Sequence, residues 1–139
     1  MNRLAFFDTN ILIYADDRSV PAKQTRALEL ITKYQRSGLL VVSIQVLQEY
    51  YAAATRKLRV DPETAQRKVQ LLTRSRVVRF EAADVIAAIE LHRLTRISFW
   101  DAEIVHAARL AGAGIVYSED LQHGGMLGGV RIDNPFLPA

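Results

Sequence analysis

Short apolar runs alternate along this chain with amphipathic stretches, and that alternation constrains the fold more than any other feature. We expect strands at residues 4–7, 39–42, 77–80 and 115–117, and a weaker one at 130–132. We expect helices at residues 21–37, 44–58, 82–95 and 100–111, and one more starting at Asp61-Pro62-Glu63. The pattern predicts an α/β fold in which helices flank a mainly parallel sheet of four to five strands. The length of 139 residues suits one domain, residues 1–139.

Acidic and polar side chains follow the carboxyl ends of these predicted strands. Asp8 comes directly after the first strand, between two very apolar stretches. Ser43 follows the second strand, and Ser118 and Asp120 follow the fourth. Because ligands of open parallel sheets bind beyond the carboxyl ends of the strands, we expect these side chains to lie near one another.

Two further acids lie on the apolar faces of predicted helices. Glu49 shares a face with Val46, two turns into its helix, where no capping role reaches it. Asp101 shares a face with Ile104 in the first turn of its helix. An acid in a first turn also suits the helix dipole, so Asp101 is either a helix-start residue or part of a site. Asp16 precedes Pro21 in a polar turn and is interpreted as a surface residue.

Taken together, the acids form a set of four with no Lys or Arg at the adjacent helical positions. The set is Asp8, Glu49, Asp101 and Asp120, and Glu119 is a rival for the fourth place. A carboxylate cluster without a fixed cation suits a hard divalent metal such as Mg²⁺ or Mn²⁺.

Positive charge gathers in the middle of the chain. Residues 50–100 hold ten Lys or Arg and five Asp or Glu, whereas residues 101–139 hold two and five. A basic stretch attracts nucleic acid, although a solvated helix surface also explains it. Arg56 and Lys57 are candidates for phosphate contacts. Trp100 could stack on a base, but packing in the core is the favoured interpretation.

The chain contains no cysteine, which excludes thiol nucleophiles, zinc–thiolate sites and disulfides. That composition suits a reducing cytosol, and we expect a cytoplasmic protein. No apolar run approaches the ~20 residues of a membrane span.

Four motifs in order along the chain resemble those of the PIN-domain ribonucleases, and within them the VapC-type toxins of toxin–antitoxin pairs. They are FFDTNILIY with Asp8 and Asn10, SIQVLQEYY with Ser43 and Glu49, SFWDAEIVHAA with Asp101, and YSEDLQHG with Ser118 and Asp120. The resemblance covers nearly the whole chain. The spacing of that family's last acid after a Ser or Thr favours Asp120 over Glu119.

The resemblance implies a three-layer PIN-like fold and an Mg²⁺- or Mn²⁺-dependent endoribonuclease that leaves a 5′-phosphate and a 3′-hydroxyl. It also implies a homodimer that a cognate antitoxin inhibits. Asp8 and Asp101 would bind the metal, while Glu49 and Asp120 would bind a second ion or hold and deprotonate the attacking water. The residues interpreted as substrate-binding or as holding the acids in place are Asn10, Ser43, Ser118, Arg56 and Lys57.

Two alternatives stay open from the residues alone. One is a non-catalytic RNA- or partner-binding module with a degenerate site. The other is a phosphohydrolase with an aspartyl nucleophile, which is disfavoured because Asn10 stands where a second Asp is needed. A metal-free ribonuclease with two catalytic histidines is also the weaker mechanism, since His92 and His106 fall within predicted helices.

Overall fold

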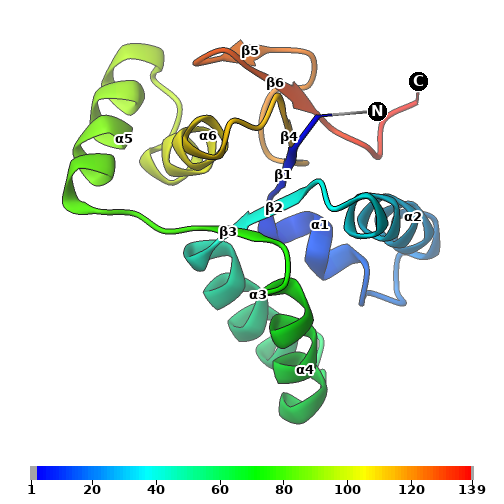
Figure 1. The fold of residues 1–139 in the computed structure, drawn as a ribbon. Coiled ribbons are helices and arrows are strands. Elements are labelled where there is room, and N and C mark those ends of the chain that lie inside the picture. Colours follow the sequence, from blue (N-terminus) through cyan, green and yellow to red (C-terminus); the bar gives the residue numbers. More distant parts are fainter. Residues whose placement is uncertain (1–2, 139) are drawn as a thin grey trace.

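A computed structural model of the chain describes residues 3–138 and shows one six-stranded sheet with helices on both faces (Figure 1). The strands are β1 (Ala5–Phe7), β2 (Leu40–Ser43), β3 (Arg76–Val78), β4 (Ile115–Tyr117), β5 (Met126–Leu127) and β6 (Val130–Asp133). The helices are α1 (Thr9–Tyr14), α2 (Pro21–Ser37), α3 (Ile44–Arg56), α4 (Pro62–Leu72), α5 (Ala82–Thr95) and α6 (Phe99–Ala111). The predicted α/β class is therefore confirmed.

The strand order is β3-β2-β1-β4-β6-β5, and every neighbouring pair is parallel except β5 with β6. Helix α6 packs across β1, β2, β3, β4 and β6, and α5 packs on α6. Helices α1 and α2 lie on the other side, and the α3–α4 pair extends away from the sheet (Figure 1). No helix among residues 3–138 combines the length and the apolar character that a membrane crossing requires.

The sheet has one strand more than the four to five expected, and one short helix was not expected at all. The extra strand, β5, has two residues and pairs antiparallel with β6 across Gly128 and Gly129, whose φ angles are 56° and 82°. Two residues are too few to show an alternating pattern in the sequence. The extra helix, α1, has six residues, and its apolar positions run consecutively rather than at helical spacing.

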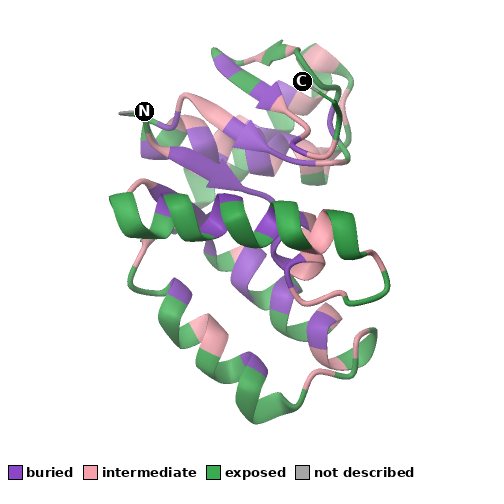
Figure 2. Ribbon diagram, turned by 90° about the vertical axis from the view of Figure 1, so that its right-hand side faces the viewer, coloured by how far each residue is buried: buried purple, intermediate pink, exposed green. Residues whose placement is uncertain are grey.

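The core lies at the centre of the sheet, where all three residues of β1 are fully buried (Figure 2). Strand β1 pairs with β2 on one edge and β4 on the other. Phe7, Tyr34 and Tyr117 pack ring against ring with centroids 5.3–5.5 Å apart. This cluster fixes the carboxyl ends of β1 and β4, directly before Asp8 and Ser118.

Candidate functional site

A cavity of about 470 Å³ opens at the carboxyl ends of the parallel strands. All four predicted acids, Asp8, Glu49, Asp101 and Asp120, line it. They come from four segments that the fold brings together: the end of β1, helix α3, the first turn of α6 and the loop after β4.

Asp8 is the buried member of the group, with 7% of its surface exposed. Its side chain caps α1 by accepting from the Thr9 backbone N–H at 2.7 Å. It also accepts from the Ser118 hydroxyl at 2.8 Å. Burial raises the pKa of Asp8 from 3.8 to about 6, and the charges of Asp120 and Glu49 add to the rise, while the two hydrogen bonds oppose it.

Glu49 projects from α3 towards the beginning of α1. Its carboxylate accepts from the Thr9 hydroxyl at 2.8 Å and, more weakly, from the Gln45 side chain at 3.5 Å. Glu49 is exposed to solvent, so it is free to turn within the cavity. Its negative charge is close enough to raise the pKa of Asp8.

Asp101 sits in the first turn of α6, but Ser98 supplies the cap of that helix. The Ser98 hydroxyl accepts from the Asp101 backbone N–H at 3.0 Å. Within residues 3–138, no hydrogen bond or ion pair uses the Asp101 carboxylate. The helix start therefore does not require this carboxylate, which faces the cavity instead.

Asp120 is oriented by Asn10 and Ser118. The Asn10 amide donates to the Asp120 carboxylate at 3.0 Å, and its carbonyl oxygen accepts from the Glu119 backbone N–H at 3.2 Å. The Ser118 hydroxyl accepts from the Asp120 backbone N–H at 3.1 Å while it donates to Asp8. One serine and one asparagine thus fix the positions of two acids from distant segments.

Glu119, the rival for the fourth place, is held away from the cavity. It forms an ion pair with Lys23 of α2, and it accepts from the Tyr14 hydroxyl at 2.7 Å. The Lys23 ammonium also lies over the Tyr14 ring, 4.7 Å from its centroid. Burial alone would raise the pKa of Glu119, but its hydrogen bonds with Lys23 and Tyr14 outweigh burial and lower it. Of the two neighbours, only Asp120 lines the cavity.

The four acids share a cavity without forming a finished metal site. Within residues 3–138, no three His, Asp or Glu side chains converge closely enough to hold an ion. Each of Asp8, Glu49 and Asp120 instead accepts hydrogen bonds from neutral neighbours. The donor chemistry fits a hard divalent cation, because several carboxylates face one space and no Lys, Arg or His forms an ion pair with them in the described residues.

Comparison with known protein families agrees with this arrangement. The family model of the PIN domain matches residues 5–123, which include the whole acid set. The chain belongs to the PIN domain family. Among curated protein sequences, none matches the chain significantly.

Solved structures of toxin and toxin–antitoxin proteins share the fold. A toxin–antitoxin complex from Klebsiella pneumoniae is 19% identical with a TM-score of 0.69, covering 94% of this chain and 97% of that one. VapC20 of Mycobacterium tuberculosis, a toxin that cleaves the sarcin–ricin loop, is 21% identical with a TM-score of 0.61. The match covers 84% of this chain and 89% of VapC20. A matching chain of DNA-bound VapBC from Salmonella typhimurium is 19% identical with a TM-score of 0.66. The match covers 96% of this chain and 98% of that one. The three-layer PIN-like fold is therefore confirmed.

The polar residues predicted to bind substrate fall into two groups in this PIN fold. Asn10 and Lys57 line the carboxylate cavity, whereas Arg56 is exposed outside it. Ser43 and Ser118 are buried at 5% and 0% exposure. The Ser43 hydroxyl caps α3 by accepting from the Val46 N–H at 3.2 Å. Their burial favours the interpretation that both serines hold the site together rather than touch substrate.

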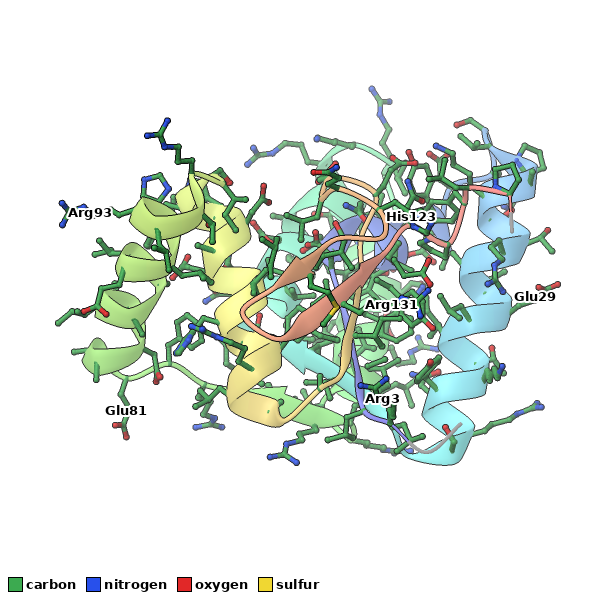
Figure 3. All side chains as sticks on the ribbon, turned by 90° about the horizontal axis from the view of Figure 1, so that it is seen from above. Arg3, Glu29, Glu81, Arg93, His123 and Arg131 are labelled. Carbon is green, nitrogen blue, oxygen red and sulfur yellow. The ribbon has the colours of Figure 1, made fainter. Side chains whose placement is uncertain are left out.

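Trp100 does not pack in the core as expected, since 63% of it is exposed and it lines the cavity. Trp100 is the second residue of α6, directly before Asp101, and this position places its ring at the wall of the cavity instead. His123 lies away from the acids: its ring accepts from the Asn134 N–H at 2.9 Å, beside the C-terminal segment (Figure 3).

Sequence reasoning missed Thr9 and Lys23. Thr9 links α1 to Glu49, and its position directly after Asp8 was the available signal. Lys23 orients Glu119 from 96 positions away, and no local pattern marks that contact.

Proposed function

We propose that this PIN protein is a metal-dependent endoribonuclease that hydrolyses RNA phosphodiester bonds as the toxin of a type II toxin–antitoxin system. One observation carries the proposal: four carboxylates from four segments face one cavity, three of them accept hydrogen bonds from neutral donors, and none forms an ion pair within residues 3–138. Repulsion among them is relieved when a divalent cation binds, so the apo arrangement favours such an ion.

Asp8 and Asp101 are the proposed ligands of Mg²⁺ or Mn²⁺, and Glu49 and Asp120 hold a second ion or the attacking water. The bound ion would lower the pKa of that water and stabilise charge on the phosphate oxygens. Ser118 and Asn10 keep Asp8 and Asp120 in place, and exposed Glu49 turns from Thr9 towards the cavity. Lys57, at the cavity wall, contacts the RNA backbone.

The proposed reaction is an in-line displacement at phosphorus. Water attacks with Glu49 or Asp120 accepting its proton, the bond from phosphorus to the 3′ oxygen breaks, and that oxygen takes a proton from solvent. The products are a 5′-phosphate and a 3′-hydroxyl.

We also propose a cognate antitoxin and a second copy of this chain as protein partners. Two of the structures that share the fold are toxin–antitoxin assemblies, which supports an inhibitor partner. Residues 1–139 would then form one nuclease domain.

The test is cleavage of RNA by the purified protein with Mg²⁺, with Mn²⁺ and with EDTA. We expect cleavage with either ion and none with EDTA. Cleavage in a rigorously metal-free preparation would contradict the mechanism. Tight RNA binding without cleavage under any metal condition would instead support the non-catalytic binding module.

A further inference from the structure

A second cavity, of about 590 Å³, adjoins the carboxylate cavity. The two share Gln45 and Trp100 as lining residues. The second cavity lies where the start of α3, the segment after β3, α5 and α6 meet. None of the four acids of the carboxylate cavity lines it, so the proposed chemistry does not use it.

The walls of this cavity include flat and apolar side chains that are accessible to solvent. Trp100 is 63% exposed, and its ring packs edge-on against Phe99 with centroids 5.2 Å apart. Ile44 and Val85 are each 38% exposed. Phe80 is anchored edge-on against the His106 ring at 5.4 Å. An aromatic ring with a fixed neighbour offers a stacking surface at little entropic cost.

Two opposite charges line the same cavity without neutralising each other. Arg79 comes from the segment after β3, and Glu103 comes from α6. Among residues 3–138, neither side chain takes part in an ion pair. A ligand in this cavity can therefore accept hydrogen bonds from the Arg79 guanidinium and donate hydrogen bonds to the Glu103 carboxylate.

We propose that this second cavity binds one unpaired nucleobase of the RNA, beside the phosphate that is cleaved, and that guanine fits it best. Guanine presents O6 and N7 as acceptors to Arg79, and N1–H and N2–H as donors to Glu103. Its flat ring stacks on Trp100, the residue directly before Asp101. This inference rests on the proposed nuclease function and assigns its base specificity.

Both position and charge favour a base over an apolar side chain of a partner protein. The shared wall of Gln45 and Trp100 makes the second cavity continuous with the site proposed for the scissile phosphate. An apolar side chain placed there would cover Arg79 and Glu103 without replacing their hydrogen bonds to water, which is unfavourable. A guanine base offers both groups a partner.

The experiment is a titration of the wild-type protein with 5′-GMP, 5′-AMP, 5′-CMP and 5′-UMP. Trp100 is the single tryptophan of the chain, so its fluorescence reports on the wall that this cavity shares with the carboxylate cavity, and the Arg79 and Glu103 variants assign the binding to this cavity. We expect 5′-GMP to bind about tenfold tighter than 5′-UMP. Glu103→Gln and Arg79→Gln should each remove most of that preference and keep the fluorescence signal.

Two matched controls carry the same substitutions elsewhere. Arg93→Gln on α5 and Glu29→Gln on α2 change exposed residues whose side chains point away from the molecule (Figure 3). Both should leave the preference for 5′-GMP unchanged.

Trp100→Leu should lower the affinity for all four nucleotides about tenfold, as measured by calorimetry. Trp100→Phe should recover most of the lost affinity.

Equal binding of the four nucleotides, unaffected by Glu103→Gln, would overturn the proposal. So would a Trp100→Leu protein that binds nucleotides normally but loses affinity for its antitoxin, since the cavity would then belong to that protein. Nucleotide binding is measured without cleavage, so its failure is distinct from a failure of nuclease activity. Metal-dependent cleavage with no base preference would reject the subsite and keep the nuclease.

Discussion

Asp120 and Glu119 are neighbours in the sequence, yet the fold gives their carboxylates opposite surroundings. Glu119 lies between the Tyr14 hydroxyl and the Lys23 ammonium, whose cation also lies over the Tyr14 ring. The Asp120 carboxylate accepts from the neutral amide of Asn10 and faces the carboxylate cavity. The Glu119 carboxylate is paired with a cation of the protein itself, and the Asp120 carboxylate forms no ion pair within residues 3–138.

Asp16 has the same surroundings as Glu119. Tyr50 donates to it, Lys68 contacts it at 2.6 Å, and the Lys68 ammonium lies 5.4 Å from the Tyr50 ring centroid. We call Asp16 and Glu119 the lysine-paired acids. The prediction that Asp16 is a plain surface residue was wrong, because it links the end of α1 to α3 and α4.

The contrast separates structural acids from acids that can serve a ligand. A lysine-paired acid stabilises the fold, and its carboxylate is already bound to an ammonium group and cannot bind a ligand. Three acids of the carboxylate cavity accept hydrogen bonds from neutral donors, and the repulsion among the acids remains until a cation binds. Replacing an acid by its amide should therefore have opposite effects in the two groups.

The largest expected effect is on cleavage by Asp8→Asn. The substitution removes a proposed metal ligand but keeps the side chain's shape, so RNA cleavage should fall on the order of a thousandfold. The apo protein should be as stable as wild type or more stable, because a buried charge is removed. Cleavage rates and urea unfolding measure the two effects, and near-normal cleavage would place Asp8 outside the metal site.

Stability should also depend on pH through Asp8. The folded state binds this proton more tightly than the unfolded chain, because burial raises the pKa of Asp8 from 3.8 to about 6. The free energy of unfolding should therefore fall as pH rises from about 4 to about 6, by roughly 3 kcal/mol from this group. Acids with lowered pKa, such as Glu119, act in the opposite direction. The difference between wild type and Asp8→Asn in metal-free unfolding isolates the effect, and parallel curves would contradict it.

The matched change among the lysine-paired acids is Asp16→Asn. It should lower the free energy of unfolding by about 1 to 2 kcal/mol, because Tyr50 and Lys68 lose a charged partner. RNA cleavage by the folded protein should remain close to wild type. Urea unfolding gives the free energy of unfolding, and initial rates give the cleavage activity. An Asp16→Asn protein more stable than wild type would contradict the distinction between the lysine-paired acids and the acids of the carboxylate cavity.

The smallest effect concerns Lys57, which lines the carboxylate cavity, and Arg56, which does not. Lys57→Gln should reduce the salt slope of RNA binding by about one, and Arg56→Gln should change it less. Binding is measured in the Asp8→Asn background to prevent cleavage. Equal salt slopes for the two variants would mean that both cations attract RNA only through the overall positive charge.

Much of this fold follows from local patterns in the sequence. The predicted bounds of α2 and α5 match the structure, and Pro21 at the start of α2 and Gly38 at its end, with φ 73°, are local signals. Asp8 and Asp120 could be predicted because they follow strands whose carboxyl ends meet, and Glu49 and Asp101 because they lie on the apolar faces of helices. The lysine-paired acids could not, because Glu119 and Lys23 lie on separate elements and neither carries a signal of the other. The exposure of Trp100 depends on where α6 meets the sheet edge, which helical periodicity does not describe.

Metal binding tests the central claim most directly, since it requires neither the natural RNA nor the antitoxin. Mg²⁺ is titrated into metal-free wild type, Asp8→Asn and Asp16→Asn at neutral pH while the melting temperature is followed. At about 100 times the dissociation constant, Mg²⁺ should stabilise wild type by roughly 2.7 kcal/mol. The Asp16→Asn protein should gain the same increment from its lower starting point, and Asp8→Asn should gain little. Equal increments in wild type and Asp8→Asn would contradict a metal site built on the carboxylate cavity.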